Sequence, residues 1–204
     1  MRYYIADCHF FHEALLDHMD CRGFASVEEM NDHMVACWNR KVRPCDEVVI
    51  LGDFSWGTWA QTVTILDRLH GRLFLIRGNH DRFLDAPSFD PGRFGWIRDY
   101  AELNDNRRKV ILFHYPIACY NGQYRKDDKG KPKTYMLYGH IHATADQQLV
   151  DVYQKNVRNS YAADPAGKMH AVPCQLINCF CQYSDYEPLT LDEWIENDRK
   201  RQES

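Results

Sequence analysis

Short apolar runs recur along the chain, and each is followed at once by polar residues. Residues 2–6 are largely apolar and aromatic, and the segments 48–51, 73–76, 110–113 and 135–138 are continuous runs of apolar or aromatic residues. Short continuous runs of this kind, bounded by turn residues, are typical of strands that are covered on both faces. The pattern therefore predicts five buried strands.

Three other segments carry helix signals. Residues 26–29 (SVEE) have the spacing of a capping box, and apolar residues follow at helical intervals as far as Trp38. A second helix is expected over about 58–69, because Gly71 follows it as a stop signal. Another capping box predicts a last helix near 190–199.

The alternation of strands and helices predicts an α/β fold with buried sheets and outer helices. No linker or repeat divides the sequence, so residues 1–204 are expected to form a single domain. Two long loops are expected, a basic one at 120–134 and another at about 154–168. Loops of this length are often functional, so the basic loop is either a lid over a substrate phosphate or a solvated segment.

Composition narrows the classes of protein that fit. The net charge is −4, which gives no indication of nucleic acid as a partner, although a local basic loop could still bind one. No apolar segment is long enough to span a bilayer and no signal-peptide pattern opens the chain, so a cytoplasmic protein is expected. The eight cysteines form no C-x-x-C pair and are expected to be buried thiols.

Polar residues that can bind metals follow each predicted strand. The motifs are Asp7-x-His9, Gly52-Asp53, Gly78-Asn79-His80-Asp81, His114 and Gly139-His140-x-His142. Ligand sites in α/β sheets collect at the carboxyl ends of the strands. Residues at i and i+2 of an extended segment point to one face, so the two side chains of each x-separated pair can aim together. Carboxylate, amide and imidazole ligands without thiolate suit Mn²⁺, Fe or Zn²⁺.

In this order the five motifs resemble those of calcineurin-like metallophosphoesterases, most closely the small single-domain bacterial and phage members. The motifs run from residue 7 to residue 142, about two thirds of the chain. The resemblance implies a four-layer α-β-β-α sandwich with two mixed sheets. It also implies a dinuclear centre whose ligands are Asp7, His9 and His142 for one ion, Asn79, His114 and His140 for the other, and Asp53 as the bridge.

The resemblance further implies two catalytic positions. His80 matches the histidine that protonates the leaving oxygen or stabilises the phosphoryl charge, and Asp81 is expected to orient it by accepting its other ring proton. The two divalent ions are expected to be Mn²⁺ in the first place, with Fe, Zn²⁺ or Ni²⁺ as alternatives. Two such ions can hold a hydroxide and the phosphate oxygens for in-line attack.

Some positions depart from the family pattern or stay open. Aromatic residues follow Asp53, where many members carry a charged residue, so substrate preference does not transfer. Trp56 and Trp59 could stack on a nucleobase, but packing is the favoured interpretation. His12 could either reach toward the phosphate or lie on a solvated face. Asn178 could support the site, but its signal is too weak to include it.

The predicted function is metal-dependent hydrolysis of phosphate esters, with a phosphodiester on a small nucleotide-like substrate favoured. A phosphomonoesterase, pyrophosphohydrolase or nuclease on the same scaffold is the alternative. A non-catalytic scaffold that binds a partner protein is more remote, because it should have lost ligands that are all present here. The sequence leaves the oligomeric state open.

Overall fold

The computed structural model describes residues 1–163 and 166–203 and contains two four-stranded sheets. In the first sheet the strand order is β1 (Arg2–Ile5), β2 (Glu47–Ile50), β3 (Arg72–Ile76) and β4 (Ile97–Arg98). In the second it is β10 (Leu176–Asn178), β7 (Thr134–Tyr138), β6 (Arg108–Phe113) and β5 (Tyr100–Asp105). The five predicted strands are all present, as β1, β2, β3, β6 and β7.

The two sheets differ in the direction of their strands. All neighbouring strands of the first sheet are parallel. The second sheet is mixed, because β5 runs antiparallel to β6. The expectation of two mixed sheets is therefore wrong for the first one. In the part of the chain that the structure describes, its antiparallel pairing is limited to an isolated bridge between Tyr4 and Leu189 at the outer edge of β1.

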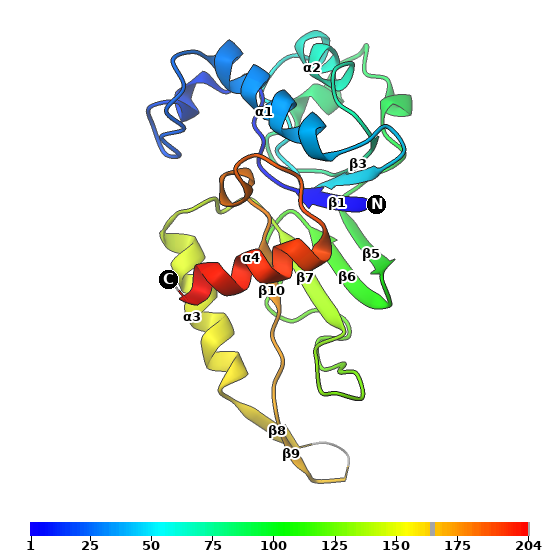
Figure 1. The fold of residues 1–204 in the computed structure, drawn as a ribbon, viewed down its shortest axis with the longest axis vertical. Coiled ribbons are helices and arrows are strands. Elements are labelled where there is room, and N and C mark those ends of the chain that lie inside the picture. Colours follow the sequence, from blue (N-terminus) through cyan, green and yellow to red (C-terminus); the bar gives the residue numbers. More distant parts are fainter. Residues whose placement is uncertain (164–165, 204) are drawn as a thin grey trace.

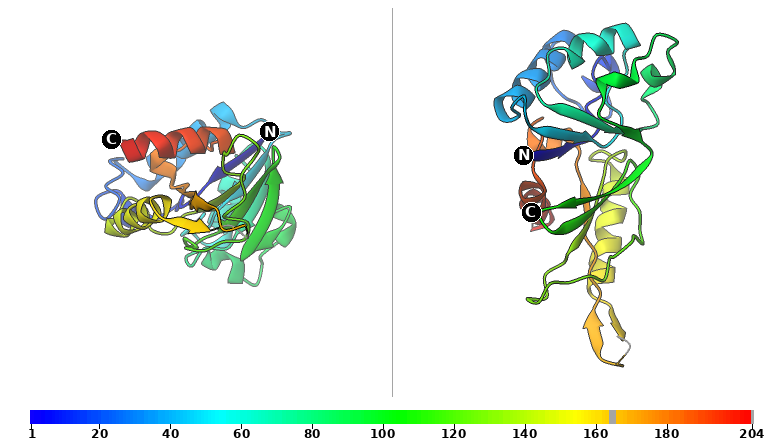
Figure 2. Two further views of the ribbon diagram at one scale, coloured as in Figure 1. Left: turned by 90° about the horizontal axis from the view of Figure 1, so that it is seen from below. Right: turned by 90° about the vertical axis from the view of Figure 1, so that its right-hand side faces the viewer.

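The sheets pack face to face with helices outside, as the α/β prediction requires (Figures 1 and 2). One cluster of buried side chains lies between the sheets. It includes Tyr4 and Leu51 from the side of the first sheet and Leu112 and Leu137 from the second, which are all fully buried. The outer face of the first sheet is covered by α1 (Val27–Lys41) and α2 (Trp59–Leu66). The outer face of the second is covered by α3 (Ala145–Arg158).

The last helix, α4 (Leu191–Glu203), closes one edge of the sandwich. Its Trp194 is fully buried in the cluster between the sheets, and the indole Nε1–H donates to the carbonyl of Tyr4 at 2.9 Å. Short 3₁₀ turns complete the described elements: Glu13–Leu15, Arg82–Asp85, Pro91–Arg93 and Cys181–Ser184. The hairpin of β8 (Tyr161–Ala163) and β9 (Met169–Ala171) projects from the end of the molecule away from α1 and α2 (Figures 1 and 2).

Among the described α-helices, α3 is the one that the sequence pattern did not predict. The loop expected at about 154–168 is wrong, because α3 continues to Arg158 and β8 follows it. The usual helical spacing of buried apolar residues is missing from α3, because Leu149 and Val152 are exposed whereas Gln147 and Gln154 are buried. The glutamines are tolerated there because they accept hydrogen bonds from the sheet, as Gln154 does from the backbone N–H of Leu176.

Two smaller findings concern the cysteines and the length of the helices. The cysteines are free thiols, of which five are buried and three exposed, so the prediction of buried thiols holds for the larger part. Within the described residues, no helix has the length and apolar character that crossing a membrane requires.

Candidate metal centre

The predicted ligands meet where strands of both sheets end. The loops that follow β1 and β2 are joined by backbone hydrogen bonds from Asp7 N–H to Gly52 O (3.1 Å) and from His9 N–H to Asp53 O (2.9 Å). The residue after β1 is joined to the second sheet in the same way, because the N–H of Ala6 donates to the carbonyl of Cys179 at 2.8 Å. These bonds bring ligands from the two sheets into one buried cluster.

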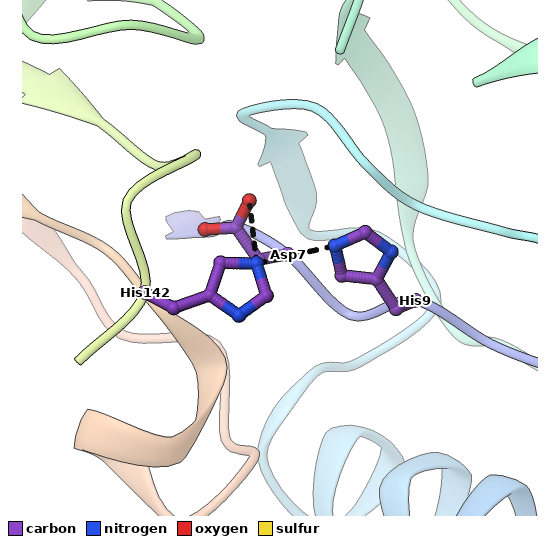
Figure 3. Close-up of side chains that lie close together, drawn as sticks. All are labelled: Asp7, His9 and His142. Atoms are coloured by element: carbon purple, nitrogen blue, oxygen red, sulfur yellow. Dashed lines mark hydrogen bonds and ion pairs between the residues drawn. The ribbon is translucent and has the colours of Figure 1, made fainter. Parts of the chain in front are cut away.

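One group of ligands consists of Asp7, His9 and His142, whose side chains point toward one another (Figure 3). Their ligand atoms all lie within 4.8 Å of one another. The Nε2 atoms of the two rings are 3.2 Å apart, and His142 Nε2 lies 3.9 Å from Asp7 Oδ1. All three residues are buried, so these donors face each other and not water.

The second group consists of Asp53, His114 and His140, again within 4.8 Å of one another. Asn79 adjoins it, with its Oδ1 atom 3.0 Å from His114 Nε2. Asp53 and His114 are buried, whereas His140 is half-buried and Asn79 is exposed. The more accessible side of the centre therefore lies at this second group.

Asp53 lies between the two groups. Its Oδ2 atom is 3.4 Å from His9 Nε2 in the first group and 3.4 Å from His114 Nε2 in the second. Its Oδ1 atom accepts the backbone N–H of His80 at 2.8 Å. One carboxylate oxygen thus faces a ring of each group.

Two rings are held in the tautomer that a metal ligand needs. His114 Nδ1 lies 2.8 Å from the carbonyl of Leu51, and His142 Nδ1 lies 2.6 Å from Asp20 Oδ1. Because a carbonyl and a carboxylate only accept, both Nδ1 atoms carry hydrogen and direct Nε2 into the cluster. The oxygen and nitrogen donor set, with two buried carboxylates, therefore fits divalent cations.

The backbone at this centre is unusual. Five of the expected ligands have a positive φ: Asp7 (56°), His9 (49°), Asp53 (52°), His140 (73°) and His142 (47°). Non-glycine residues adopt this left-handed conformation rarely, and such residues concentrate at functional sites. Space is equally restricted, because a Cβ atom on Gly78 would overlap the backbone nitrogen and the carboxylate of Asp53.

Burial and neighbouring charge set the ionisation of the cluster. Burial opposes the charge of Asp53, but the hydrogen bond and charge of His114, with the charge of His9, lower its pKa to about 2. Burial likewise opposes a charged His114, but Asp53 and Asp7 raise its pKa to about 9. Burial raises the pKa of Asp7 to about 6 and lowers that of His9. A divalent cation must therefore displace the proton of His114.

His80 lies beside the centre, but the expected contact with Asp81 is wrong. The Nδ1 atom of His80 has no hydrogen-bond partner within residues 1–163 and 166–203. The carboxylate of Asp81 instead accepts the backbone N–H groups of Gly78 (2.8 Å), Asp53 (3.0 Å) and Phe54 (2.7 Å). Asp81 therefore positions the backbone of two ligand loops and not the ring of His80.

The aromatic residues after Asp53 divide into two kinds. Trp59 is buried and stacks on Phe83, as the packing interpretation predicts. Trp56 is 44% exposed and stacks on His12 with ring centroids 4.0 Å apart and planes 5° from parallel. Its centroid lies 4.8 Å from that of His80. His12 and Trp56 thus form an aromatic wall next to the centre.

His142 has two supports, of which the sequence did not reveal the first. Asp20 accepts its Nδ1 hydrogen and is held in turn by Arg22, whose Nη2 donates to Asp20 Oδ2 at 2.9 Å. Arg22 also donates to the carbonyls of Asp7 (3.0 Å) and Cys8 (2.7 Å).

Asn178 is the second support, since its Nδ2 donates to the carbonyl of His142 at 3.0 Å. It is the last residue of β10, and its place at the end of an apolar run was a signal too weak to include it among the expected site residues. Asp20 lies in an irregular segment and had none.

The basic segment 120–134 does not cover this centre. The N–H of Lys109 at the start of β6 donates to the carbonyl of Lys133 at 2.8 Å, just before the start of β7. His114 and His140 follow the opposite ends of these strands. The lid interpretation is therefore wrong, because the segment lies at the amino ends of β6 and β7.

Replacing Asp20 by asparagine tests the support of His142. We expect divalent-metal affinity to fall about 10–100-fold, because the hydrogen bond would lose its charge and orient the ring less firmly. Competition with a metal-sensitive dye measures the affinity, and circular dichroism checks the fold. Asp17→Asn removes an exposed carboxylate from the same loop and should change nothing. Equal affinities for both variants would contradict the role of Asp20.

Comparison with known proteins agrees with this geometry. The sequence profile of calcineurin-like phosphoesterases matches residues 3–199. An uncharacterized protein of Methanocaldococcus jannaschii is 28% identical over 192 residues, which cover 93% of this chain and 86% of that protein. The gene 66 protein of Mycobacterium phage D29 is 30% identical over 164 residues, 69% of this chain and 78% of that protein.

A solved structure has a similar fold. The crystal structure of a protein of unknown function from Aquifex aeolicus has a TM-score of 0.63 at 22% identity, over 96% of this chain and 98% of that one. The family profile over residues 3–199 confirms the resemblance of the sequence motifs. The chain belongs to the calcineurin-like phosphoesterase family and is a metal-dependent phosphoric ester hydrolase.

Proposed function

We propose that this chain hydrolyses a phosphodiester on a small nucleotide-like substrate with two divalent metal ions, Mn²⁺ in the first place. The observation that carries the proposal is the position of Asp53 Oδ2, 3.4 Å from His9 Nε2 and 3.4 Å from His114 Nε2. A carboxylate oxygen placed between two ligand groups suits a bridge between two ions. Asp7, His9 and His142 would hold one ion, and Asn79, His114 and His140 the other.

When bound, two such ions supply Lewis acidity to the phosphoryl oxygens and lower the pKa of water enough for it to attack at neutral pH. The protein's own contribution lies in position and proton transfer. His80 is partly exposed beside the centre, and its backbone N–H is fixed by Asp53 at 2.8 Å. A ring placed there can give a proton to the leaving oxygen, which is the role that we propose for His80.

The aromatic wall supports the choice of substrate. Trp56 is 44% exposed, and its ring lies 4.8 Å from the ring of His80. A leaving group protonated by His80 would lie next to this indole. Base–aromatic stacking contributes about 1–3 kcal/mol per base, so a nucleobase on the leaving side would gain from this contact. A diester provides such a group on either side of the phosphorus.

The first test is turnover by metal-stripped protein of an aryl phosphodiester and an aryl phosphomonoester, with Mn²⁺, Ni²⁺, Zn²⁺ or Mg²⁺ added back. We expect Mn²⁺ to restore cleavage and the diester to be the better substrate. Faster cleavage of the monoester would overturn the diester preference and leave the dinuclear centre intact. Failure to bind about two ions per chain would contradict the centre itself.

Replacing Asp53 by alanine should remove metal retention and activity together. The carboxylate faces both ligand sets, so its loss should weaken the binding of both ions at once. Elemental analysis of the purified protein measures the metal content. Asp105→Ala, which removes a carboxylate that hydrogen-bonds Tyr4 away from the centre, should keep both properties. Full activity of Asp53→Ala would contradict the bridging role.

Replacing His80 by alanine should separate metal retention from activity. We expect the metal content to stay near two ions per chain, while kcat falls about 10²–10⁴-fold through loss of the proton donor. A substrate whose leaving group needs no proton, such as a nitrophenyl ester, should lose less than an alkyl ester. His18→Ala, at an exposed position, is the control. Loss of metal in His80→Ala would identify His80 as a ligand.

A further inference from the structure

A second polar site lies at the other end of the second sheet, remote from the metal centre. It is a hollow of about 560 Å³ at the amino ends of β6 and β7. Six of its lining residues are basic and one is acidic: Arg107, Arg108, Lys109, Arg125, Lys126 and Lys133 against Glu102. We call this hollow the basic groove.

Most of the positive charge in the basic groove is not neutralised by the protein. Glu102 accepts hydrogen bonds from Lys109 (2.5 Å), Asn121 (3.0 Å) and Tyr100 (2.7 Å), and these bonds lower its pKa to about 2. Its charge is therefore already matched by Lys109. Arg108 pairs with Asp192.

The remaining arginines and lysines carry the surplus. Within residues 1–163 and 166–203, the side chains of Arg107, Arg125 and Lys133 form no ion pair, and all three residues are exposed. Lys126 Nζ donates to the carbonyl of Ala171, which leaves its charge unmatched.

These cations stand on ordered segments. Arg107 is at the tip of the hairpin between β5 and β6, where Asn106 and Arg107 both have positive φ (46° and 63°), as a tight two-residue turn requires. Arg125 and Lys133 are held opposite each other by the hydrogen bond from Lys133 N–H to Arg125 O at 2.9 Å. The positive charge is therefore displayed on two fixed turns.

An apolar hollow adjoins the basic groove. It measures about 520 Å³ and lies between the 120–134 segment and the β8–β9 hairpin, with Lys126 lining both hollows. Figures 1 and 2 show this segment and the hairpin at the same end of the molecule. The hollow includes Tyr124, whose side chain is 67% exposed, together with His170 and Pro173. An exposed ring thus lies directly beside a row of cations.

We infer that the basic groove and this apolar hollow together bind single-stranded nucleic acid. Cations spread over several segments suit a chain of repeating phosphates better than one phosphate group, which two of them would saturate. The exposed ring of Tyr124 offers a stacking surface for an unpaired base. A duplex has no free base for that ring, and an acidic peptide has no flat ring system at each charge.

The test measures fluorescence anisotropy of a labelled 20-mer of deoxythymidine in EDTA, so that the oligonucleotide stays intact. The variant R107E/K133E removes two unmatched cations, and R68E/K200E makes the same charge change outside both hollows. We expect R107E/K133E to weaken binding at least about tenfold. We also expect a weaker salt dependence: the slope of the logarithm of the binding constant against the logarithm of the salt concentration should become less negative by about 0.7 for each lost phosphate contact. R68E/K200E should bind nearly as the parent protein does.

Tyr124→Ala separates nucleic acid from other polyanions. We expect it to weaken binding of the 20-mer on the order of tenfold and to leave binding of inorganic polyphosphate unchanged. Equal binding by R107E/K133E and R68E/K200E would overturn the site. Preference for a duplex, or displacement of the 20-mer by polyglutamate at equal charge, would overturn its assignment to single strands. Metal-dependent aryl-ester hydrolysis should be the same in all these variants, so the result is independent of the proposed function.

Discussion

The carboxylate of Asp53 is the group on which the rest of the candidate metal centre depends. Its Oδ2 atom faces His9 and His114, and its Oδ1 atom accepts the N–H of His80. The backbone N–H of Asp53 is held by Asp81, which also holds Gly78. The backbone thus fixes one oxygen and leaves the other facing both ligand groups, so an incoming cation meets a ligand that needs little reorganisation. Such preorganisation favours binding, because less conformational freedom is lost on association.

The backbone conformation of the centre has an energetic consequence. Five expected ligands lie in the left-handed region, and each such residue costs on the order of 1–3 kcal/mol. That cost is offset by the surrounding structure, in which Asp7 and His9 are hydrogen-bonded to the loop after β2 and the strands before them are fully covered. The two sheets therefore provide more than a core. They hold loops in conformations that the loops would not adopt alone.

The fold and the ligands were predictable to different degrees. The buried strands and the residues directly after them were found from local pattern, because an apolar run and its following turn are contiguous in sequence. Helix α3 was not found, since its buried Gln147 and Gln154 invert the expected pattern. Asp20 reaches His142 across 122 positions, and no local pattern records such a contact.

The prediction that Asp81 orients the ring of His80 was wrong for a related reason. Its motif gives its place in the chain, but its partners are backbone N–H groups, two of them in a different loop. Sequence motifs identify residue types that chemistry requires, whereas hydrogen-bond partners follow from the packed structure. The same distinction explains Trp56 and Trp59, which share a motif but differ in burial.

The second sheet also shows why net charge was a poor guide to binding. Strand β6 begins next to Lys109 of the basic groove and is followed by His114 of the metal centre. At about 3.3 Å per residue, these positions are roughly 17 Å apart along the strand. That separation is about twice the screening length of roughly 8 Å at physiological ionic strength. The two ends are therefore largely screened from each other, and a net charge of −4 summed over the whole chain does not reveal the basic groove at one of them. What each end attracts is decided by its own residues, because solvent ions screen it from the other.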